Sequence, residues 1–316
     1  MEVLLQNQSG QVFDITSLVV QASLQDHINK SCALSLDILA DTDAFPSEGC
    51  RIRFSIDGSV WFLGIVFKAA KDESQVYKIT AYDQLRYLTA NDTYVFDNET
   101  ASDAVRRICN DLQLTVGSLA DTQYLISGKV CDDQAMLDMI SDCIQLTAIH
   151  TNQLYYLKDI AGAVSLRNIK DSITDLVIDP EYLLSKYSYE RSIDDDSYNL
   201  VKLVQDDADT GKRMQYVVKD STNIRAWGGI LQYYEKIDDS LNAGQMKERA
   251  KSLLTLKNRV TQTLTLTAEG DDRIRAGNVI YINIPDVSVK RFLLCTSAVH
   301  SFSGASHTVK ADFKLV

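Results

Sequence analysis

Three adjacent carboxylates are the residues in this sequence that most clearly invite a chemical reading. Asp194, Asp195 and Asp196 lie in the stretch YERSIDDDSYNLVKLV, and together they could hold a metal, supply acid and base, or form a solvated turn. A helix-loop-helix calcium site needs a Gly at its sixth position and a Glu at its twelfth, and DDDSYNLVKLVQ has neither. The stretch also leads into a strand, where neighbouring side chains point to opposite faces. The pattern favours a turn capped by Asp side chains.

The histidines form no recognisable metal motif. The sequence has four, at positions 27, 150, 300 and 307, with no HxxxH spacing and no CxxC pair to complete a zinc set. His300 and His307 flank SFSGAS, which we expect to be a hairpin tip, so the two rings could approach each other. Two histidines without a third ligand are a weak basis for a metal site, and we predict none.

Signatures of nucleophilic or phosphate chemistry are also missing. No GxSxG occurs, and Cys50 precedes a strand pattern rather than a helix N-terminus that could activate its thiol. The GGI at Gly228 does not follow the strand-GxGxxG pattern of dinucleotide sites. Nothing singles out one catalytic pair among the 43 acidic residues. We therefore predict a protein that is not an enzyme, with no catalytic residue and no cofactor.

Six cysteines occur, at positions 32, 50, 109, 131, 143 and 295. The start, MEVLLQNQSGQVF, lacks a basic region followed by an apolar stretch, so we expect synthesis in the cytoplasm and reduced thiols. No apolar run approaches the roughly 20 residues of a membrane span. The net charge of −11 argues against tight binding of nucleic acid, which needs clustered Lys and Arg.

The 316 residues allow about two domains of ~150 residues each. Alternating segments predict strands through the first ninety residues, among them SCALSLDIL, CRIRFSI and VYKITAYD, with a hairpin turn at Asp57-Gly58. Residues 88–185 predict an α+β insertion. It contains a helix capped by Thr100 or Asn98, a second helix from about Asp133 to Leu146, and a hairpin around Ala161-Gly162.

Strand patterns return after Pro180, interrupted by one helix at about 243–256. Two β regions then show the same order of features. ALSLDIL, Gly49, RIRFSI, a turn, VWFLGIVF and YKITAYD are echoed by TLTLTAE, Gly277, VIYINI, a turn at Pro285-Asp286, RFLLCTSAV and VKADFKL. The echo predicts two copies of one β module, at 1–87 and 186–316, on either side of the insertion.

Four stretches resemble the XkdQ-like baseplate hub proteins of PBSX-type defective prophages, contractile phage tails and phage-tail-like bacteriocins. They are ITAYDQLRYLTANDTYVF, YERSIDDDSYNLVKLV, WGGILQYYEKIDD and LKNRVTQTLTLTAEGDDRIRAGN. The likeness runs from about residue 50 to the C-terminus, whereas the first fifty residues match only in strand pattern. It is consistent with an infectious phage, a defective prophage or a bacteriocin as the parent particle.

The resemblance implies a mainly β fold with two tube-like β-barrel modules per chain. Three chains would form a pseudo-sixfold ring between the hexameric tail tube and the trimeric central spike. The implied partners are two further copies, the spike, the tube or tube-initiator protein, the baseplate wedges and the tape-measure protein, in a particle released by lysis. The acidic charge would suit a lumen through which DNA or the tape measure passes without adhering.

The same resemblance answers the question of the three aspartates. It assigns SIDDDSYN to a structural turn that leads into the second β module, at a candidate subunit contact. The rival functions are a tail-associated cell-wall hydrolase and a carbohydrate-binding β module. Against them, the hub pattern uses the whole length, Trp61 sits in an apolar strand, and Trp227 adjoins a Gly-rich turn. Turnover of peptidoglycan by the purified chain separates the hydrolase from the hub.

Overall fold

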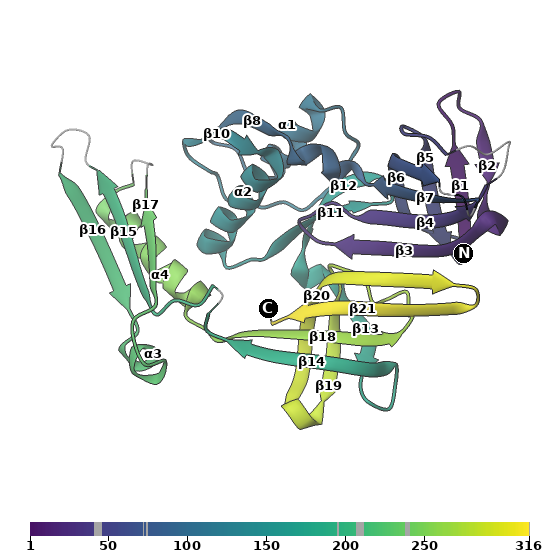
Figure 1. Cartoon of the computed structure of the whole chain (residues 1–316). Coiled ribbons are helices and arrows are strands. Elements are labelled where there is room, and N and C mark those ends of the chain that lie inside the picture. Colours follow the sequence, from purple (N-terminus) through teal and green to yellow (C-terminus); the bar gives the residue numbers. More distant parts are fainter. Residues whose placement is uncertain are drawn as a thin grey trace.

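The chain folds mainly into β-strands. The computed structural model describes residues 1–40, 46–71, 73, 75–194, 196–206, 212–237 and 241–315, so Asp195 lies outside the described residues. Figure 1 shows four parts: two β units that share an edge, an α+β part above the second unit and beside the first, and a small sheet that projects to the left. In the described part of the chain, the buried apolar residues gather in four clusters that correspond to these parts.

The first β unit follows the alternation expected from the sequence. Its strands are β1 (Glu2–Gln6), β2 (Val12–Asp14), β3 (Val19–His27), β4 (Ala33–Leu39), β5 (Arg51–Ile56), β6 (Ser59–Lys71) and β7 (Val76–Tyr82), in the order β3-β4-β7-β6-β5-β1-β2. Leu34, Leu36 and Ile38 point into its core, as the period of two requires. Asp57 and Gly58 both have positive φ, which a two-residue hairpin needs, and they connect β5 to β6.

The second β unit is built from strands that are far apart in the sequence. They are β13 (Ile173–Ile178), β14 (Leu184–Ser192), β18 (Thr261–Glu269), β19 (Val279–Ile284), β20 (Val289–Ser303) and β21 (Ser306–Lys314). They pair in the order β14-β18-β21-β20-β19-β13, which matches β3-β4-β7-β6-β5-β1 in the first unit. The last pair differs in direction, because β1 is antiparallel to β5 whereas β13 is parallel to β19.

The two units also match in detail, although the second unit includes β13, which lies inside the insertion expected at 88–185. Gly49 and Gly277 both have positive φ, and each donates its N–H to a strand residue, Val66 and Cys295 respectively. Val66 and Cys295 in turn donate to the residue after each glycine, at 2.8 and 2.9 Å. One residue further on, β6 and β20 both shift register against their partners, between Val66 and Lys68 and between Cys295 and Ser297. Val66 and Cys295 are therefore equivalent positions.

One strand joins the two units into a single sheet of 13 strands. The first part of β20 pairs with β19, and its last part, from Ser297 to Ser303, pairs antiparallel with β3 of the first unit. In the described part of the chain, the hydrogen-bonded sheet branches at β20 and has open ends at β14, β2 and β13. The fold is thus mainly β, as expected, and among the described residues hydrogen bonds do not close either unit into the expected barrel.

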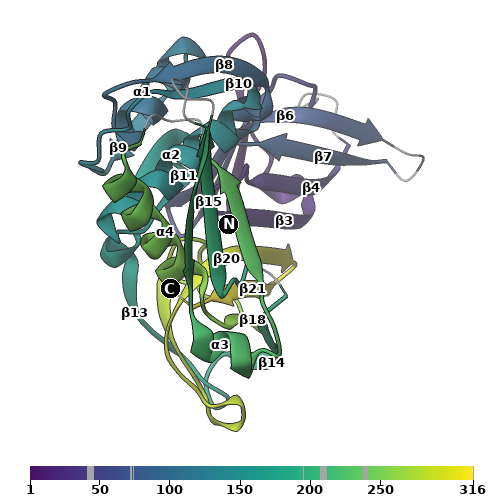
Figure 2. The same cartoon turned by 90° about the vertical axis from the view of Figure 1, so that its left-hand side faces the viewer.

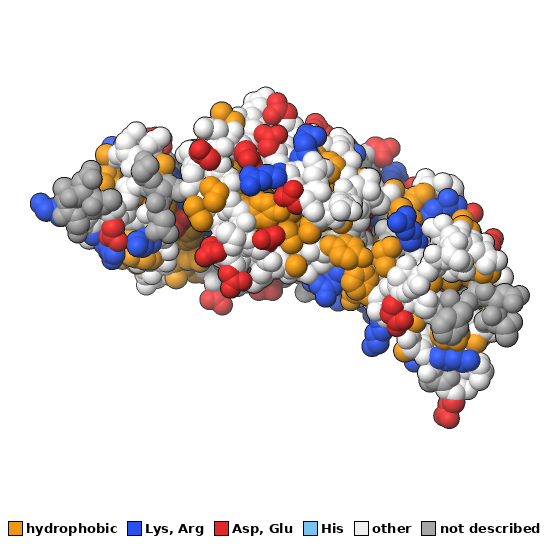
Figure 3. Space-filling model, turned by 90° about the horizontal axis from the view of Figure 1, so that it is seen from above, with side chains coloured by type: hydrophobic (Ala, Val, Ile, Leu, Met, Phe, Trp, Pro, Cys, Tyr) orange, Lys and Arg blue, Asp and Glu red, His pale blue; other side chains and the backbone are white. Residues whose placement is uncertain are grey.

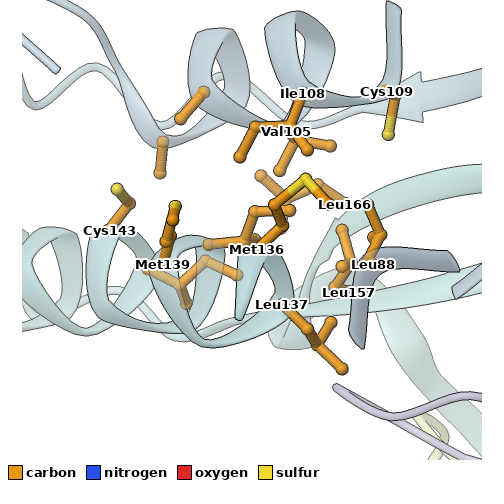
Figure 4. Close-up of a cluster of buried hydrophobic side chains, with 14 of the residues drawn as sticks. Leu88, Val105, Ile108, Cys109, Met136, Leu137, Met139, Cys143, Leu157 and Leu166 are labelled. Atoms are coloured by element: carbon orange, nitrogen blue, oxygen red, sulfur yellow. The ribbon is translucent and has the colours of Figure 1, made fainter. Parts of the chain in front are cut away.

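The α+β part lies between β7 and β13 in the sequence. It contains α1 (Ala101–Asp111), α2 (Met136–Thr151), β8 (Asn91–Phe96), β9 (Val116–Leu119), β10 (Lys129–Ala135), β11 (Tyr155–Ile160) and β12 (Ala163–Asn168). Thr100 caps α1 in a capping box with Asp103, so Thr100 rather than Asn98 is the N-cap. Figure 4 shows Val105, Ile108 and Cys109 of α1 facing Met136, Met139 and Cys143 of α2 across the core.

Two expected elements of this part have different outcomes. The hairpin around Ala161-Gly162 is confirmed, because it connects the antiparallel strands β11 and β12. The second helix is α2 and begins at Met136, three residues after the expected start, and it continues to Thr151. Its expected first turn is instead the end of β10, which pairs with β8. The apolar side chains of β10 and α2 are continuous in the sequence, so their pattern does not mark the boundary.

A separate sheet projects from the second unit between β14 and β18. Its strands β15 (Leu200–Asp206), β16 (Arg213–Lys219) and β17 (Gln232–Lys236) lie against α4 (Ala243–Lys257), and a short helix, α3 (Ser221–Ala226), connects β16 to β17. Helix α4 matches the helix expected at about 243–256. Figure 2 shows this sheet and α4 in front of the two β units. The strands of this sheet pair only with one another in the described residues.

Candidate functional site

The aspartate stretch connects β14 to the projecting sheet. The amide of Asp194 donates to Ser192 Oγ at 3.0 Å, and Asp196 has a positive φ of 52°, as in a tight turn. The carboxylate of Asp196 also accepts from Lys257 Nζ of α4 at 2.5 Å. Asp194 and Asp196 therefore belong to a turn, as expected, although the strand that follows enters the projecting sheet. In the described residues, no three His, Cys, Asp or Glu side chains are grouped as a metal site would require.

The two histidines at the hairpin of β20 and β21 do meet. His300 Nδ1 and His307 Nε2 are 2.9 Å apart, and His300 Nε2 lies 2.9 Å from the carbonyl oxygen of Ile274. Burial lowers the pKa of His300 to about 3, so its ring is neutral at physiological pH. The His300 ring packs edge-on against Trp61 with centroids 4.9 Å apart. Trp61 is thus an internal contact between the two units.

A buried ionic junction lies beside these rings, where both β units and the α+β part come together. Its centre is Asp26 of β3, which has no exposed surface. Arg275, from the loop before β19, donates Nε to Asp26 Oδ2 at 2.5 Å, and the amide of Ala276 donates to the same oxygen at 3.1 Å. Lys158 of β11 lies with its Nζ 2.7 Å from Asp26 Oδ1. We call Asp26, Lys158 and Arg275 the junction triad.

Each cation of the triad also contacts another part of the chain. Lys158 Nζ donates to the carbonyl oxygen of Ala276 at 2.6 Å. The guanidinium of Arg275 lies 4.5 Å from the centre of the Trp61 ring and donates to the Trp61 carbonyl oxygen at 3.2 Å. A buried charge is tolerated only when it is paired and hydrogen-bonded, and here every member has both kinds of partner. The triad therefore fixes the three parts relative to one another.

Electrostatics explain why Asp26 stays charged in the interior. Burial by itself would raise the pKa of Asp26, but the charges of Arg275 and Lys158 and their hydrogen bonds together hold that pKa well below its usual range. The carboxylate is thus ionised whenever the chain is folded near neutral pH. The arrangement has no open position for a substrate, because both carboxylate oxygens accept from neighbouring groups. The junction triad is therefore a structural contact.

A second buried carboxylate ties the first unit to the α+β part. Asp83, at the end of β7, accepts from the amide of Cys32 at 2.9 Å and from Ser31 Oγ at 2.9 Å. Burial and the nearby carboxylate of Asp159 raise the pKa of Asp83 to about 7. Asp159 accepts from Gln84 and from the amide of Gly162. Asp83 is therefore partly protonated near neutral pH, unlike Asp26.

The sequence analysis identified neither the junction triad nor the buried carboxylate of Asp83. A signal existed for Asp26, because Ala22, Leu24 and Asp26 occupy alternate positions on one face of a strand, and that face is buried. An acid on an apolar face points to a buried partner. Its partners Lys158 and Arg275 lie far away in the sequence and carry no local pattern, so only the fold reveals them.

A groove of about 540 Å³ lies between α2 and the projecting sheet and is lined in part by Leu146, Ile149 and Tyr233. Its charges are paired: Lys129 with Asp142 at 3.1 Å and Arg249 with Glu235 at 2.7 Å. Figure 3 shows acidic and basic side chains interspersed over the upper face of the molecule. In the described part of the chain, no helix is both long and apolar enough to cross a membrane.

The fold of the whole chain is shared with solved proteins. A tail protein from Neisseria meningitidis MC58 superposes with a TM-score of 0.71 at 12% identity, covering 99% of this chain and 96% of that one. The E. coli c3393 protein, described as a type VI secretion component with structural similarity to T4 tail proteins gp27 and gp5, gives a TM-score of 0.56 at 10% identity. It covers 93% of this chain and 73% of that one.

The chain belongs to the YQBQ-like family, which matches residues 22–314. It is 34% identical over 269 residues to the uncharacterized protein YqbQ of Bacillus subtilis (strain 168). It is 33% identical to XkdQ of the phage-like element PBSX from the same strain. Each alignment covers 84% of this chain and 81% of the relative. The resemblance noted in the sequence is thereby confirmed, and it extends into the first fifty residues.

Proposed function

We propose that this chain is the structural hub of the baseplate in a contractile tail or tail-like particle, where it joins a trimeric central spike to a hexameric tail tube. The observation that carries the proposal is the repeat. A chain with two equivalent β units can present six such units when three copies assemble, and six units match a sixfold tube while three chains match a threefold spike. The two units would be the tube-like modules of that ring.

The relatives support a role in a tail. XkdQ carries the name of a phage-like element, and the Neisseria protein with the same fold is described as a tail protein. The c3393 protein is described as similar to gp27 and gp5 of the T4 tail. For this chain we propose the spike, the tube or tube-initiator protein, the wedges and the tape-measure protein as partners. We further propose synthesis in the cytoplasm and release of the finished particle by lysis.

We propose that the hub has no enzymatic activity. Its buried ionic residues are engaged with one another, as in a scaffold that must keep its shape under load. The three aspartates at 194–196 would serve the turn between β14 and the projecting sheet. Incubation of the purified chain with peptidoglycan is expected to release no soluble fragments, and release above the level of a heat-treated sample would favour a hydrolase.

The proposal is tested by following the chain in its native cell. A tagged chain is expressed from its own locus, the particle is induced, and the lysate is separated by sedimentation. We expect the tag in a large particle together with sheath, tube and spike proteins, identified by mass spectrometry. A small species free of tail proteins under inducing conditions would contradict the hub assignment.

A further inference from the structure

Among the edges of the shared sheet that have no described neighbour are one on β14 and one on the end of β6. β14 pairs with β18 along one side, and no described strand lies along its other side. The last part of β6, from Lys68 to Lys71, pairs with β7, whereas β5 pairs only with the earlier part of β6. Figure 1 shows β14 in the lower β unit and β6 in the upper one. Free edges present backbone groups that can accept another strand.

The contact inside the chain shows how one β unit can join another. There the last part of β20 pairs antiparallel with β3, from Ser297 opposite His27 to Ser303 opposite Gln21. In the repeat, β6 is equivalent to β20 and β14 is equivalent to β3. The same contact between the other two edges would place the end of β6 beside β14. The two edges belong to different units, and in the described part of the chain they do not pair with each other.

We infer that the end of β6 in one copy of this chain pairs antiparallel with β14 of a second copy, in the register that β20 adopts with β3. The inference deepens the proposed hub function and rests on it, since a hub ring needs such a joint. The contact is head-to-tail, so it leaves one β6 and one β14 free until the last copy closes the ring.

The repeat fixes the register of this joint. Leu36 of β4 and Leu266 of β18 are equivalent, and they lie opposite Ala22 and Tyr187 respectively. Counting along the strands makes Asp26 equivalent to Arg191 and His27 equivalent to Ser192. Lys68 is equivalent to Ser297, because each is the first paired residue after the register shift. Lys68 of one copy should therefore lie opposite Ser192 of the next.

The charges at the two joints are complementary, with their signs exchanged. Inside the chain, the acid Asp26 on β3 binds the base Arg275 in the loop just before Gly277. At the second joint, the position equivalent to Asp26 carries the base Arg191. The position equivalent to Arg275 is Ser47, and the acid Glu48 lies one residue further on, directly before Gly49. Both side chains are exposed in the single chain. An ion pair between copies would thus replace the buried pair within the chain.

A second charge contact follows from the same register. Glu190 would lie opposite Ala70 and diagonal to Lys68, a cross-strand arrangement in which opposite charges attract. Glu190, Ala70 and Lys68 are exposed in the single chain. The same register places Lys71 diagonal to Arg191, so this joint would combine one attractive and one repulsive diagonal contact.

Disulfide cross-linking tests the register directly. All six native cysteines are buried, so oxidation of the folded chain acts on introduced thiols. The variant with Lys68→Cys and Ser192→Cys is expected to form covalent dimers and then covalent trimers under mild oxidation. The matched control combines Lys68→Cys with Lys186→Cys, which lies on the same strand about 20 Å from Ser192. It is expected to give no such ladder.

The outcomes separate this inference from the hub function. An oligomeric chain in which the Lys68–Ser192 variant fails to cross-link, or cross-links no better than the control, would overturn the strand contact and leave the ring intact. A chain that stays monomeric at its highest soluble concentration and does not cross-link would also overturn it. The sedimentation experiment then still decides whether the chain belongs to a tail.

Charge exchange provides a test that needs no cysteine. Glu48→Arg or Arg191→Glu alone is expected to weaken self-association by about 2- to 5-fold, the scale of an exposed ion pair, and the two changes together should restore it. Glu248→Arg makes the same charge change on α4 and is expected to leave self-association as it is. Equal weakening by all three single variants, without recovery in the double variant, would contradict the proposed pair. Self-association is measured by sedimentation velocity.

Discussion

The carboxylate of Asp26 and the guanidinium of Arg275 lie 249 positions apart in the sequence and 2.5 Å apart in the structure. This pair connects the first β unit to the second, and Lys158 adds the α+β part to the same carboxylate. The pair is buried beside the strand contact of β3 with β20. One ionised side chain therefore contacts all three parts of the molecule at once.

Removing the charge of Asp26 is expected to destabilise the whole molecule. Asp26→Asn leaves Arg275 and Lys158 buried without a counter-charge, which typically costs about 3–5 kcal/mol of folding free energy. Urea unfolding followed by circular dichroism measures the change. The control is Glu2→Gln, which breaks the exposed pair between Glu2 and Arg53 and should cost less than about 1 kcal/mol. Similar losses in both variants would show that burial of the triad contributes little.

Asp83 is expected to make stability fall as the pH rises from about 4 to about 7. Its pKa is about 7 in the folded chain and close to 3.8 when unfolded, so the folded chain binds more protons in this interval. The contribution is fully present below pH 4 and is lost as the pH passes 7. It is on the order of a few kcal/mol.

The test compares the pH dependence of unfolding in the wild type and in Asp83→Asn. His300 has the opposite sign, since its pKa is lowered, and it acts in an overlapping interval, so the difference between the two proteins is the relevant quantity. We expect this difference to change steadily between pH 4 and pH 7 and to be constant above. A difference that does not vary with pH would mean that Asp83 titrates normally in the folded chain.

Gly277→Ala is expected to be more damaging than Gly49→Ala, although the two glycines are equivalent in the repeat. Both have positive φ, which costs a non-glycine residue about 1–3 kcal/mol. At Gly277 a Cβ atom would also lie 2.6 Å from the Tyr156 ring, whereas at Gly49 it meets the flexible end of Gln8 at 3.2 Å. Thermal unfolding should rank the variants, with Gly229→Ala, which meets nothing within 4 Å, as the neutral control.

All six thiols are expected to be unreactive in the folded chain. Each cysteine is free and buried, and burial raises the pKa of Cys109 and of Cys143 to about 12, so little thiolate is available. A chromogenic disulfide reagent should release no colour from the native protein and six equivalents in denaturant. Fast reaction of one or more thiols in the native state would place those cysteines at the surface.

Much of the repeat could be predicted from the sequence, because it is encoded locally. Alternation marked β4, β5 and β7, and Gly49 and Gly277 stood at matching places since both backbones need a positive φ. The echo was therefore visible as an order of strands and turns. The equivalent register shifts in β6 and β20 were not visible, because they depend on pairing with neighbouring strands.

The junction triad and the projecting sheet show where sequence patterns lose information. β15 and β16 carry the same strand pattern as the repeat, yet they pair with β17 and pack on α4, and alternation does not specify a partner strand. Asp26, Lys158 and Arg275 come from three segments with no shared spacing. The contact between the two histidines could be predicted from the sequence, since both flank one hairpin and the hairpin brings His300 to His307.

The pairing of β3 with β20 also has a consequence for the time course of synthesis. A ribosome adds roughly 5–20 residues per second, so the 249 residues between Asp26 and Arg275 take roughly 10 to 50 seconds to make. Throughout that interval β3 has a bare edge and Asp26 lacks its guanidinium partner. A nascent chain in this state is open to premature pairing with its neighbours on the same message, and it offers a binding site to holding chaperones. Completion of β20 ends this vulnerable period.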